Sequence, residues 1–508
     1  MKRIGRIIDM VFEKELRAYY LIALCSVCFI LFYSAFSSPL YPGLYAWDAA
    51  SFMLGGKIIA NGGVLYLDYF DQKGPILFFI HALGHALFGQ RIGIFIIQVV
   101  FFCISALFMY KIARLFINDN KKAFGAVFLS VLLFGVTFEN GALTEELSLP
   151  FILSVQYFIL KFLKEADGLH NPFCAFWYGI CVAAIGLTRV TNATLCCSMI
   201  LCVAILLASR KKVRNLLQNI FAFLLGVACV IIPVFLYFYE KDAMEQMLLG
   251  IYGFSTGYAL HGLNKGLQGW IAWILKSMPL IAVILAAPVY VKKSSKELGI
   301  CVFFSGIMIL LSLCLGNSYM HYFTLAVPLY LVGICMMQNL MNGKNLKNTL
   351  CNLWQKKGVY ICIFLALIFT WGYYGARLVI YSGGNLLKFT THYYKEESDL
   401  HRKQASVIPE EDKGYVLAYN IPAKWYMETD TIPCFRYAAF QEDFRRGIPE
   451  MDEEFEDMFE NTPPKWIAVG ELEQVEMYVL KEALERKYEL VSEVDGISIF
   501  KLNAETLE

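Results

Sequence analysis

Long apolar runs separated by short polar segments occupy most of the chain up to residue 381. A helix of about 20 apolar residues is long enough to cross the hydrocarbon core of a bilayer. Runs near that length lie at 19–36, 92–110, 123–138, 147–163, 173–188, 193–209, 217–239, 270–291, 298–315, 320–340 and 358–381. The pattern predicts a polytopic α-helical membrane protein with about eleven transmembrane helices. The first is expected to be retained, because Ser37-Ser38-Pro39 does not resemble a small-residue cleavage site.

A polar, glycine-rich stretch at 41–75 interrupts this pattern after the first run. It contains Asp48 between aromatic and small residues, and further on it contains Asp68, Asp71 and Lys73. Acidic, basic and aromatic side chains close together beside a membrane are typical of a catalytic or binding site. This stretch is therefore the first place where we expect chemistry.

The apolar run at 76–88 decides the topology, because every later loop changes side if this run crosses the membrane. Short cytoplasmic loops keep an excess of lysine and arginine. If the run lies in the outer interface, the predicted inner segments hold 22 Lys and Arg residues, and the outer loops before residue 382 hold six. The bias therefore predicts a multi-pass protein of the plasma (inner) membrane with a cytoplasmic N-terminus. The first outer loop, 38–91, is expected to carry interfacial helices.

The composition turns polar from Ser382 onward. Short apolar runs with β-branched or aromatic residues predict strands, whereas helical apolar spacing predicts helices. Strands are expected at 414–420, 465–470, 489–492 and 497–501, and helices at 451–460 and 472–486. The sequence thus predicts a transmembrane domain at 1–381 and a small extracytoplasmic α/β domain at 382–508.

Composition supports a lipid environment and narrows the function. Of 508 residues, 58% are hydrophobic and 17% are charged, whereas soluble chains carry about 25% charged residues. The net charge of +1 gives no case for nucleic-acid binding. The 15 cysteines lie almost entirely in apolar runs, without a disulfide framework or zinc-type spacing, so we interpret them as small hydrophobic residues.

The polar residues of 41–75 each have a structural and a chemical interpretation. Asp48 either caps the helix that follows it or acts as a base. Asp68 and Asp71 are either turn formers or members of a site. Lys73 either extends toward lipid headgroups or contacts an anion such as a lipid phosphate.

Other polar residues are predicted to lie on the same outer side. Arg189 falls between two spans, where a charge is costly and normally faces a partner or a cavity, and Asn192 follows it closely. Glu145 and Glu146 open the fourth span, where acidic residues also suit the helix dipole.

Histidines give two further candidates. His81 and His85 have the i,i+4 spacing of a metal pair, but no HExxH context or third ligand accompanies them, which favours a structural role. His321 and Tyr322 open a predicted span from the outer side, where they serve either a site or headgroup contact.

Taken together, the chain resembles membrane glycosyltransferases of the GT-C class. In particular, it resembles glycosyltransferase family 39, the protein O-mannosyltransferases and aminoarabinose transferases. Four features in roughly residues 1–330 carry it: Asp48 early in the first outer loop, Gln72-Lys73-Gly74-Pro75 before an apolar helix, L-T-E-E at 143–146, and G-L-T-R-x-x-N at 186–192, supported by H-Y-x-x-x-x-x-P at 321–328. Lys73 is followed by Gly-Pro rather than Pro-Pro, and Gln72 stands where the aminoarabinose branch has an acidic metal ligand. No metal is therefore carried over.

The resemblance implies transfer of a sugar from a polyprenyl-phosphate donor to a hydroxyl of a cell-envelope acceptor on the outer face, with inversion. It assigns Asp48 as the base and Lys73 and Arg189 to the donor phosphate. Glu145, Glu146 and Asn192 would then orient the sugar or the acceptor. A leaving phosphate needs stabilisation of its charge, and an acceptor hydroxyl needs an aligned base, so the residue types fit this chemistry.

Two other functions fit a polytopic protein. A polysaccharide polymerase or ligase normally places its largest outer loop late between spans, whereas here the loop rich in polar groups comes first. A transporter normally shows repeated halves and broken midplane helices, and the sequence has neither. The sequence identifies no cofactor, sugar or acceptor.

Overall fold

The computed structural model describes residues 15–41, 47–165, 168–254, 263–293, 295–342, 368, 371–380, 383–384, 387 and 393–503. The chain forms two compact units. Unit 1 contains Met1–Ser34, Ile96–Phe235 and Ala259–Gly383, and unit 2 contains Ala35–Phe95, Leu236–Tyr258 and Gly384–Glu508.

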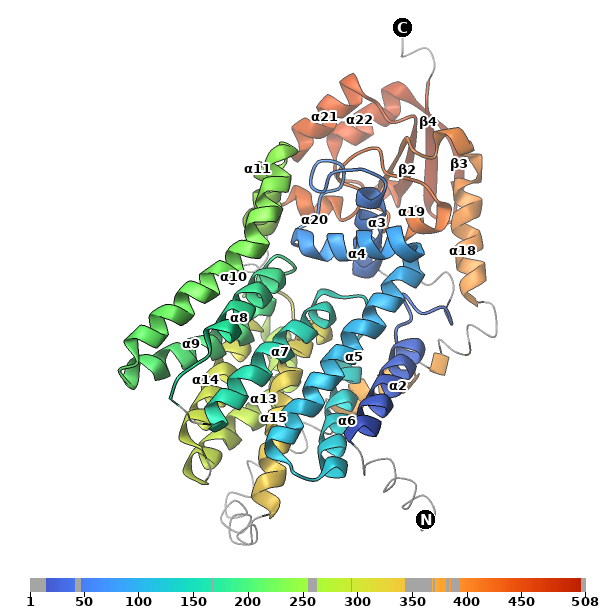
Figure 1. Ribbon diagram of the computed structural model, residues 1–508. Coiled ribbons are helices and arrows are strands. Elements are labelled where there is room, and N and C mark those ends of the chain that lie inside the picture. The colour runs from blue at the N-terminus through green and yellow to red at the C-terminus, as the bar shows by residue number, and fades with distance from the viewer. Residues whose placement is uncertain are drawn as a thin grey trace. The chain divides into compact units, whose positions relative to one another are not determined.

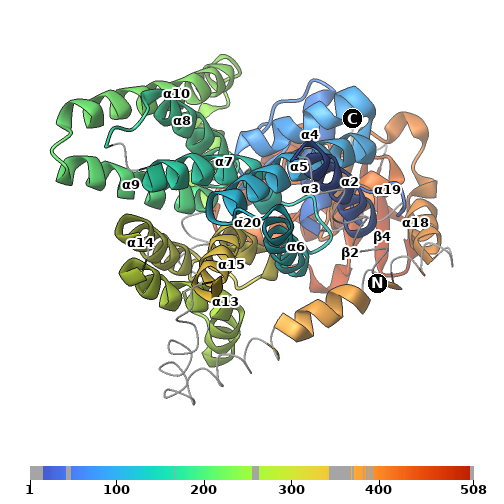
Figure 2. The same cartoon turned by 60° about the horizontal axis from the view of Figure 1, so that its bottom comes forward.

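Unit 1 is built from long apolar helices (Figures 1 and 2). They are α2 (Glu15–Tyr33), α5 (Gln90–Phe116), α6 (Asn120–Thr137), α7 (Thr144–Glu165), α8 (Pro172–Gly186), α9 (Thr194–Ser209), α10 (Val213–Glu240), α13 (Leu267–Lys293), α14 (Lys296–Ser312) and α15 (Val327–Asn342). Two 3₁₀ helices, η1 (Val190–Ala193) and η3 (Met320–Ala326), precede α9 and α15. Helix α14 packs between α13 and α9.

Ten of the predicted apolar runs coincide with these helices. The eleventh, 358–381, falls largely outside the described residues, although 371–380 is helical. Within the part of the chain that the structure describes, seven helices are long and apolar enough to cross a membrane. The prediction of a polytopic helical membrane fold is confirmed, and the number of eleven spans stays a prediction.

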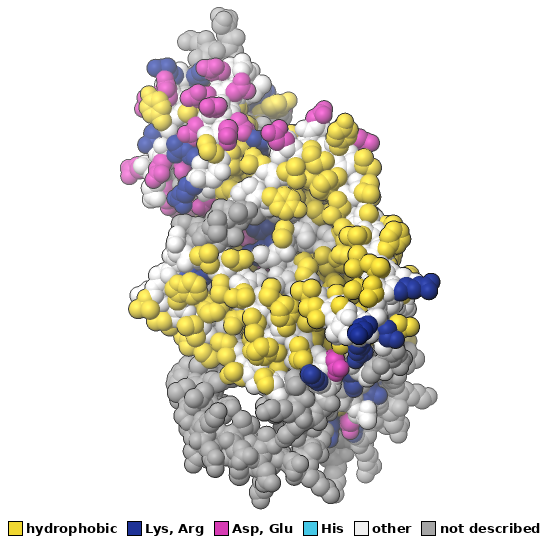
Figure 3. Space-filling model, turned by 90° about the vertical axis from the view of Figure 1, so that its left-hand side faces the viewer, with side chains coloured by type: hydrophobic (Ala, Val, Ile, Leu, Met, Phe, Trp, Pro, Cys, Tyr) yellow, Lys and Arg dark blue, Asp and Glu magenta, His cyan; other side chains and the backbone are white. Residues whose placement is uncertain are grey.

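The helix surfaces carry the apolar side chains that lipid requires. Figure 3 shows apolar side chains over a broad area of the helices, and acidic side chains gathered over the C-terminal part of unit 2. Helix α10 has almost no buried length, and it exposes Leu217, Phe221 and Leu224 among others. Because such a surface is unfavourable in water, the exposure fits contact with lipid tails.

Helices α8 and α10 approach closely because glycines face each other at their contact. A Cβ atom on Gly179 would lie 2.1 Å from the carbonyl oxygen of Phe223, and one on Gly226 would lie 2.1 Å from that of Phe176. Small residues let helix backbones approach in this way. The short α8 is thus fixed along α10 by backbone-to-backbone packing.

Unit 2 combines the first outer segment with the C-terminal residues. Its helices are α3 (Trp47–Ala60), α4 (Pro75–Phe88), α11 (Met244–Leu248), α18 (Tyr393–Gln404), α19 (Lys424–Thr429), α20 (Gln441–Arg445), α21 (Met451–Asn461) and α22 (Tyr478–Lys487), with a π-helix, η2, at Leu249–Phe254 and short 3₁₀ turns η4 (Ala405–Val407), η5 (Glu410–Asp412) and η6 (Leu472–Gln474). Gly55 and Gly56 of α3 lie against Phe78 and His81 of α4, so a Cβ on Gly56 would come 2.6 Å from that of His81.

The C-terminal part of unit 2 contains the predicted small α/β domain with a four-stranded sheet. Its strands are β1 (Val416–Tyr419), β2 (Trp466–Gly470), β3 (Tyr488–Val494) and β4 (Ile497–Leu502), in the order β1-β2-β4-β3. Strand β1 is parallel to β2, whereas β4 is antiparallel to both neighbours, with Ala468 opposite Ala418 on one side and Ile499 on the other. All residues of β1 and β2 are buried, so these strands form the centre of the domain core.

Candidate functional site

In unit 1, an ion pair joins the start of α7 to the end of α8. The Arg189 Nη1 atom binds Glu145 Oε1, and the two side chains are 17% and 2% exposed. The guanidinium also lies 4.0 Å from the ring centroid of Tyr322, as in a cation–π contact. The G-L-T-R, L-T-E-E and H-Y elements therefore meet. We call Glu145, Arg189, Asn192 and Tyr322 the Arg189 cluster.

Asn192 fixes the backbone of this cluster. Its Nδ2 atom donates to the carbonyl oxygen of Thr144 (3.2 Å) and to the hydroxyl of Ser148 (3.0 Å). These bonds hold η1 against the first turn of α7, next to Glu145. Asn192 is completely buried, and its Oδ1 atom has no hydrogen-bond partner among the described residues.

Glu146 has different partners from Glu145, although the two are adjacent. Its carboxylate accepts a hydrogen bond from Gln98 Nε2, and Gln98 accepts one from the hydroxyl of Ser34 (3.1 Å). Nothing in the sequence pattern singled out Gln98 or Ser34. Both lie within predicted spans, where a lone amide or hydroxyl is unremarkable until its partner is known.

Glu139 is the site residue that sequence reasoning missed most clearly. Its Oε2 atom lies 2.6 Å from Nδ1 of His321, and the His321 ring stacks on Tyr319. Glu139 begins a run of four residues with positive φ, ending at Ala142 with φ of 60°. Non-glycine residues in this region are strained, and such strain concentrates at functional sites. The E-N-G-A sequence, whose Asn and Gly favour this geometry, was the available signal.

In unit 2, several residues of the polar stretch gather around Asp71 and the neighbouring Lys73. Asp48 lies in the first turn of α3, half-buried, whereas Asp71 is almost completely buried. One Asp71 oxygen accepts a hydrogen bond from the backbone amide of Lys73 (2.9 Å). Burial raises the pKa of Asp71 to about 6, against the lowering effects of the Lys73 charge and of backbone hydrogen bonds, and the Asp48 charge raises it further.

The Lys73 ammonium makes no hydrogen bond or ion pair within the described part of the chain, and its side chain is half-buried. Its backbone is fixed, because the hydroxyl of Tyr66 donates to its carbonyl oxygen (2.7 Å). Burial holds the pKa of Tyr66 well above its usual range, so the hydroxyl stays protonated. We call Asp48, Tyr66, Asp71 and Lys73 the Lys73 cluster.

Asp68 lies apart from this chemistry. It is exposed, and its Oδ2 atom accepts a hydrogen bond from the backbone amide of Val64 (2.6 Å). This hydrogen bond within the turn agrees with the interpretation of Asp68 as a turn former.

The histidines of α4 do not form a metal site with other groups in the described ranges. Neither ring nitrogen of His81 has a hydrogen-bond partner there, and burial lowers its pKa to about 3, so the ring is neutral. No group of three or more His, Cys, Asp or Glu side chains that could hold a metal occurs among the described residues. His81 packs against Phe52 and Gly56 instead.

Comparison with known proteins gives a family-model match over part of the chain and a similarity in fold. The model of the family described as dolichyl-phosphate-mannose-protein mannosyltransferase matches residues 72–238. The chain is similar in structure to ArnT from Cupriavidus metallidurans bound to undecaprenyl phosphate, with a TM-score of 0.57, 11% identity, and coverage of 96% of this chain and 97% of that chain. For the same protein in the apo state, the TM-score is 0.56 at 12% identity, covering 99% of each chain.

An oligosaccharyltransferase from Archaeoglobus fulgidus in the apo form gives a TM-score of 0.47 at 12% identity, with coverage of 89% of this chain and 69% of that chain. No curated protein sequence matches the chain. The resemblance to GT-C membrane glycosyltransferases that the sequence motifs indicated is confirmed. The family match begins next to Lys73 and includes Glu145, Glu146, Arg189 and Asn192, whereas Asp48 precedes it.

Proposed function

We propose that this protein is a glycosyltransferase that moves a sugar from a polyprenyl-phosphate donor to a hydroxyl group of a cell-envelope acceptor on the outer face of the membrane. The observation that carries the proposal is the half-buried Lys73 ammonium, which makes no hydrogen bond or ion pair among the described residues and has the Asp71 carboxyl only as a neighbouring charge. A buried cation normally has an anionic partner, and a lipid-linked phosphate supplies one. The similar ArnT structure with bound undecaprenyl phosphate supports this choice of anion.

Arg189 is the second proposed phosphate contact. A guanidinium has five N–H donors, and Glu145 and the Tyr322 ring orient it in a fixed direction. A positive group held in place before the reaction stabilises developing charge at little cost in reorganisation. In this proposal, Glu145 orients Arg189, Asn192 supports the backbone beside it, and Glu146 orients the sugar or the acceptor.

Asp48 is the proposed base. The acceptor oxygen forms a bond to the anomeric carbon while the bond from that carbon to the phosphate oxygen breaks. The hydroxyl proton passes to the Asp48 carboxylate, and the electron pair leaves with the phosphate, next to Lys73. Attack opposite to the leaving group inverts the anomeric configuration. Asp71 lies near Asp48 and Lys73, and we propose that it sets the backbone of Lys73.

The test compares cells that express the wild-type protein, Lys73→Ala or no protein. Mass spectrometry of cell-envelope glycans and prenyl-linked sugars is expected to show one sugar missing from an acceptor and its prenyl-phosphate form accumulating in the latter two strains. Lys121→Ala, at the start of α6 in a predicted inner segment, is the matched control and should behave as wild type. Identical glycan and prenyl-sugar profiles in all strains would rule out the proposed function.

A further inference from the structure

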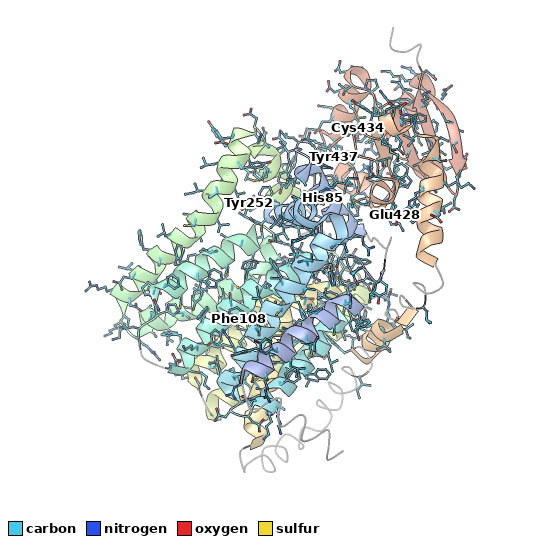
Figure 4. All side chains as sticks on the ribbon, turned by 45° about the vertical axis from the view of Figure 1, so that its right-hand side comes forward. His85, Phe108, Tyr252, Glu428, Cys434 and Tyr437 are labelled. Atoms are coloured by element: carbon cyan, nitrogen blue, oxygen red, sulfur yellow. The ribbon has the colours of Figure 1, made fainter. Side chains whose placement is uncertain are left out.

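The loop that carries Lys73 contacts the C-terminal domain within unit 2. Tyr66 and Phe70 of this loop are buried. The Phe70 ring packs against Tyr437 and Phe444, each with a centroid distance of 5.3 Å. Figure 4 labels Tyr437 in the C-terminal domain. A short loop gains this burial from residues that lie more than 360 positions later in the chain.

Arg436 connects this domain to the backbone of the loop at two points. Its carbonyl oxygen accepts a hydrogen bond from the amide of Phe70 (2.8 Å), and its guanidinium donates to the carbonyl oxygen of Tyr66 (3.4 Å). Tyr66 in turn donates its hydroxyl to the carbonyl oxygen of Lys73 (2.7 Å). A continuous series of contacts therefore leads from Arg436 through Tyr66 to Lys73.

Arg436 is itself held in position. Its Nη2 atom donates to the hydroxyl of Tyr437 (2.9 Å) and to Glu454 of α21, and the Tyr437 hydroxyl donates to the same carboxylate (3.1 Å). A second connection joins the domain to α3, because the almost buried Lys57 ammonium binds Asp430 at 2.7 Å. The domain thus contacts both segments that carry the Lys73 cluster.

We propose that the C-terminal domain sets the position of the Lys73 ammonium, and that Arg436 is the positioning residue through which it acts. The inference rests on the proposed phosphate contact of Lys73. The ammonium group of a lysine is carried on a flexible four-carbon stem. Fixing the backbone at Lys73 is therefore the main way in which the fold can direct this charge. In this proposal, the domain contributes to binding of the donor phosphate. A domain that only bound the acceptor would not need contacts with the Lys73 loop.

The experiment measures binding of two probes, undecaprenyl phosphate and the uncharged undecaprenol, to the purified full-length protein. Four variants are compared with wild type: Arg436→Gln, Lys73→Ala, the double variant and Arg445→Gln. Arg445 is the control because it is also a partly buried arginine of this domain, but it binds Asp452 at 2.7 and 2.9 Å within the domain. A charge-assisted contact is worth roughly tenfold or more in affinity.

Arg436→Gln is expected to weaken undecaprenyl phosphate binding by at least about fivefold, since part of that contact is lost, and to leave undecaprenol binding unchanged. Arg445→Gln should change neither affinity. If Arg436 acts through Lys73, the double variant should bind the phosphate no more weakly than Lys73→Ala does. A purely structural role would instead weaken both probes equally.

The outcomes separate this inference from the proposed function. A normal phosphate affinity in Arg436→Gln, or additive losses in the double variant, would overturn the positioning role while leaving the Lys73 contact in place. If Lys73→Ala itself binds both probes normally, the phosphate contact fails and the inference fails with it. Hydrogen exchange of residues 64–74 gives an independent check, because Arg436→Gln should speed exchange there whereas Lys73→Ala and Arg445→Gln should not.

Discussion

Asp48 has two interpretations that one substitution separates. Asp48→Asn keeps the size of the side chain and a polar group in the first turn of α3, but it removes the proton acceptor. If Asp48 is the base, sugar transfer should fall by about 10²–10⁴-fold, with donor binding and thermal stability nearly unchanged. A transfer assay on purified protein measures this. Normal turnover would leave Asp48 with a structural role in the first turn of α3, rather than the role of N-cap that the sequence suggested, and move the search for the base to Glu145 and Glu146.

Asp71 should make stability depend on pH. Because its folded pKa is raised to about 6 from 3.8, the folded state holds a proton that the unfolded state has lost between these values. Wild type should therefore lose stability as pH rises from about 4 to 6, by up to about 3 kcal/mol. Asp71→Asn is neutral throughout and keeps an oxygen acceptor for the Lys73 amide.

Thermal unfolding at pH 4.5 and pH 7.5 tests this expectation. The melting temperature of Asp71→Asn relative to wild type should be higher at pH 7.5 than at pH 4.5. If the difference in melting temperature between the two proteins is the same at both pH values, burial does not raise the pKa of Asp71.

The Glu145–Arg189 pair predicts a separation of stability from activity. Arg189→Gln leaves the Glu145 carboxylate buried without its ion-pair partner, and breaking such a pair costs about 3–5 kcal/mol. Adding Glu145→Gln removes that charge, so thermal stability should recover while sugar transfer stays lost. Recovery of transfer in the double variant would remove Arg189 from the phosphate site.

Residue types were easier to predict than residue partners. Lys73, Arg189 and Glu145 stand out in the sequence because a charge near bilayer depth is costly. Glu139, Gln98, Tyr66 and Arg436 did not stand out, since each gains its meaning from a partner at least 48 positions away or from a turn geometry. Tyr66, for example, is an ordinary buried tyrosine until its φ of 72° and its contact with Lys73 are known.

At the scale of elements, the apolar pattern located helices well but not their ends. The predicted run at 92–110 is part of α5, which extends over Gln90–Phe116. The helix continues beyond the apolar run because polar residues such as Lys111 and Arg114 can also be helical, and an apolar pattern does not detect them. The run at 76–88 was predicted to be an interfacial helix, and α4 is a helix of 14 residues, shorter than a typical span. Apolar length alone could not decide whether that helix crosses the membrane.

The contact between α8 and α10 gives a prediction for packing. Gly179→Ala puts a methyl group 2.1 Å from the Phe223 carbonyl oxygen, so the helices must separate. The melting temperature of the purified protein should fall by several degrees, as for an overpacking cost of about 1–3 kcal/mol. Gly125→Ala is the control, because its Cβ would meet nothing within 4 Å, and it should keep or raise stability.

For the whole molecule, the charge bias predicts which segments face outward. On a background without cysteines, cysteine at position 61 or 495 should react with an impermeant maleimide in intact cells, whereas cysteine at position 211 should not. These positions are exposed, at the end of α3, in the β3–β4 turn and between α9 and α10. Labelling of position 211 from outside would refute the proposed topology.

Long-range organisation was the part that local patterns could not supply. The four strands were predicted near their observed places, but the order β1-β2-β4-β3 depends on non-local pairings, such as that of Val416 in β1 with Trp466 in β2, 50 residues later. The sequence places a domain boundary at 382, which stays a prediction. In the structure, residues 35–95 belong to the same compact unit as the C-terminal residues. The spacing of apolar residues along the sequence does not predict this grouping.

The ion pair between Lys57 and Asp430 joins residues 373 positions apart. At a synthesis rate of about 5–20 residues per second, Lys57 leaves the ribosome roughly 20–75 s before its partner exists. During this interval the segment that carries Lys57 lacks its ion-pair partner and the Phe444 ring that packs on Phe70. A nascent chain that stops before residue 430 therefore lacks the contacts of the Lys73 loop with Arg436, Tyr437 and Phe444. In terms of the proposed function, such an unfinished chain carries Lys73 without the contacts proposed to position it.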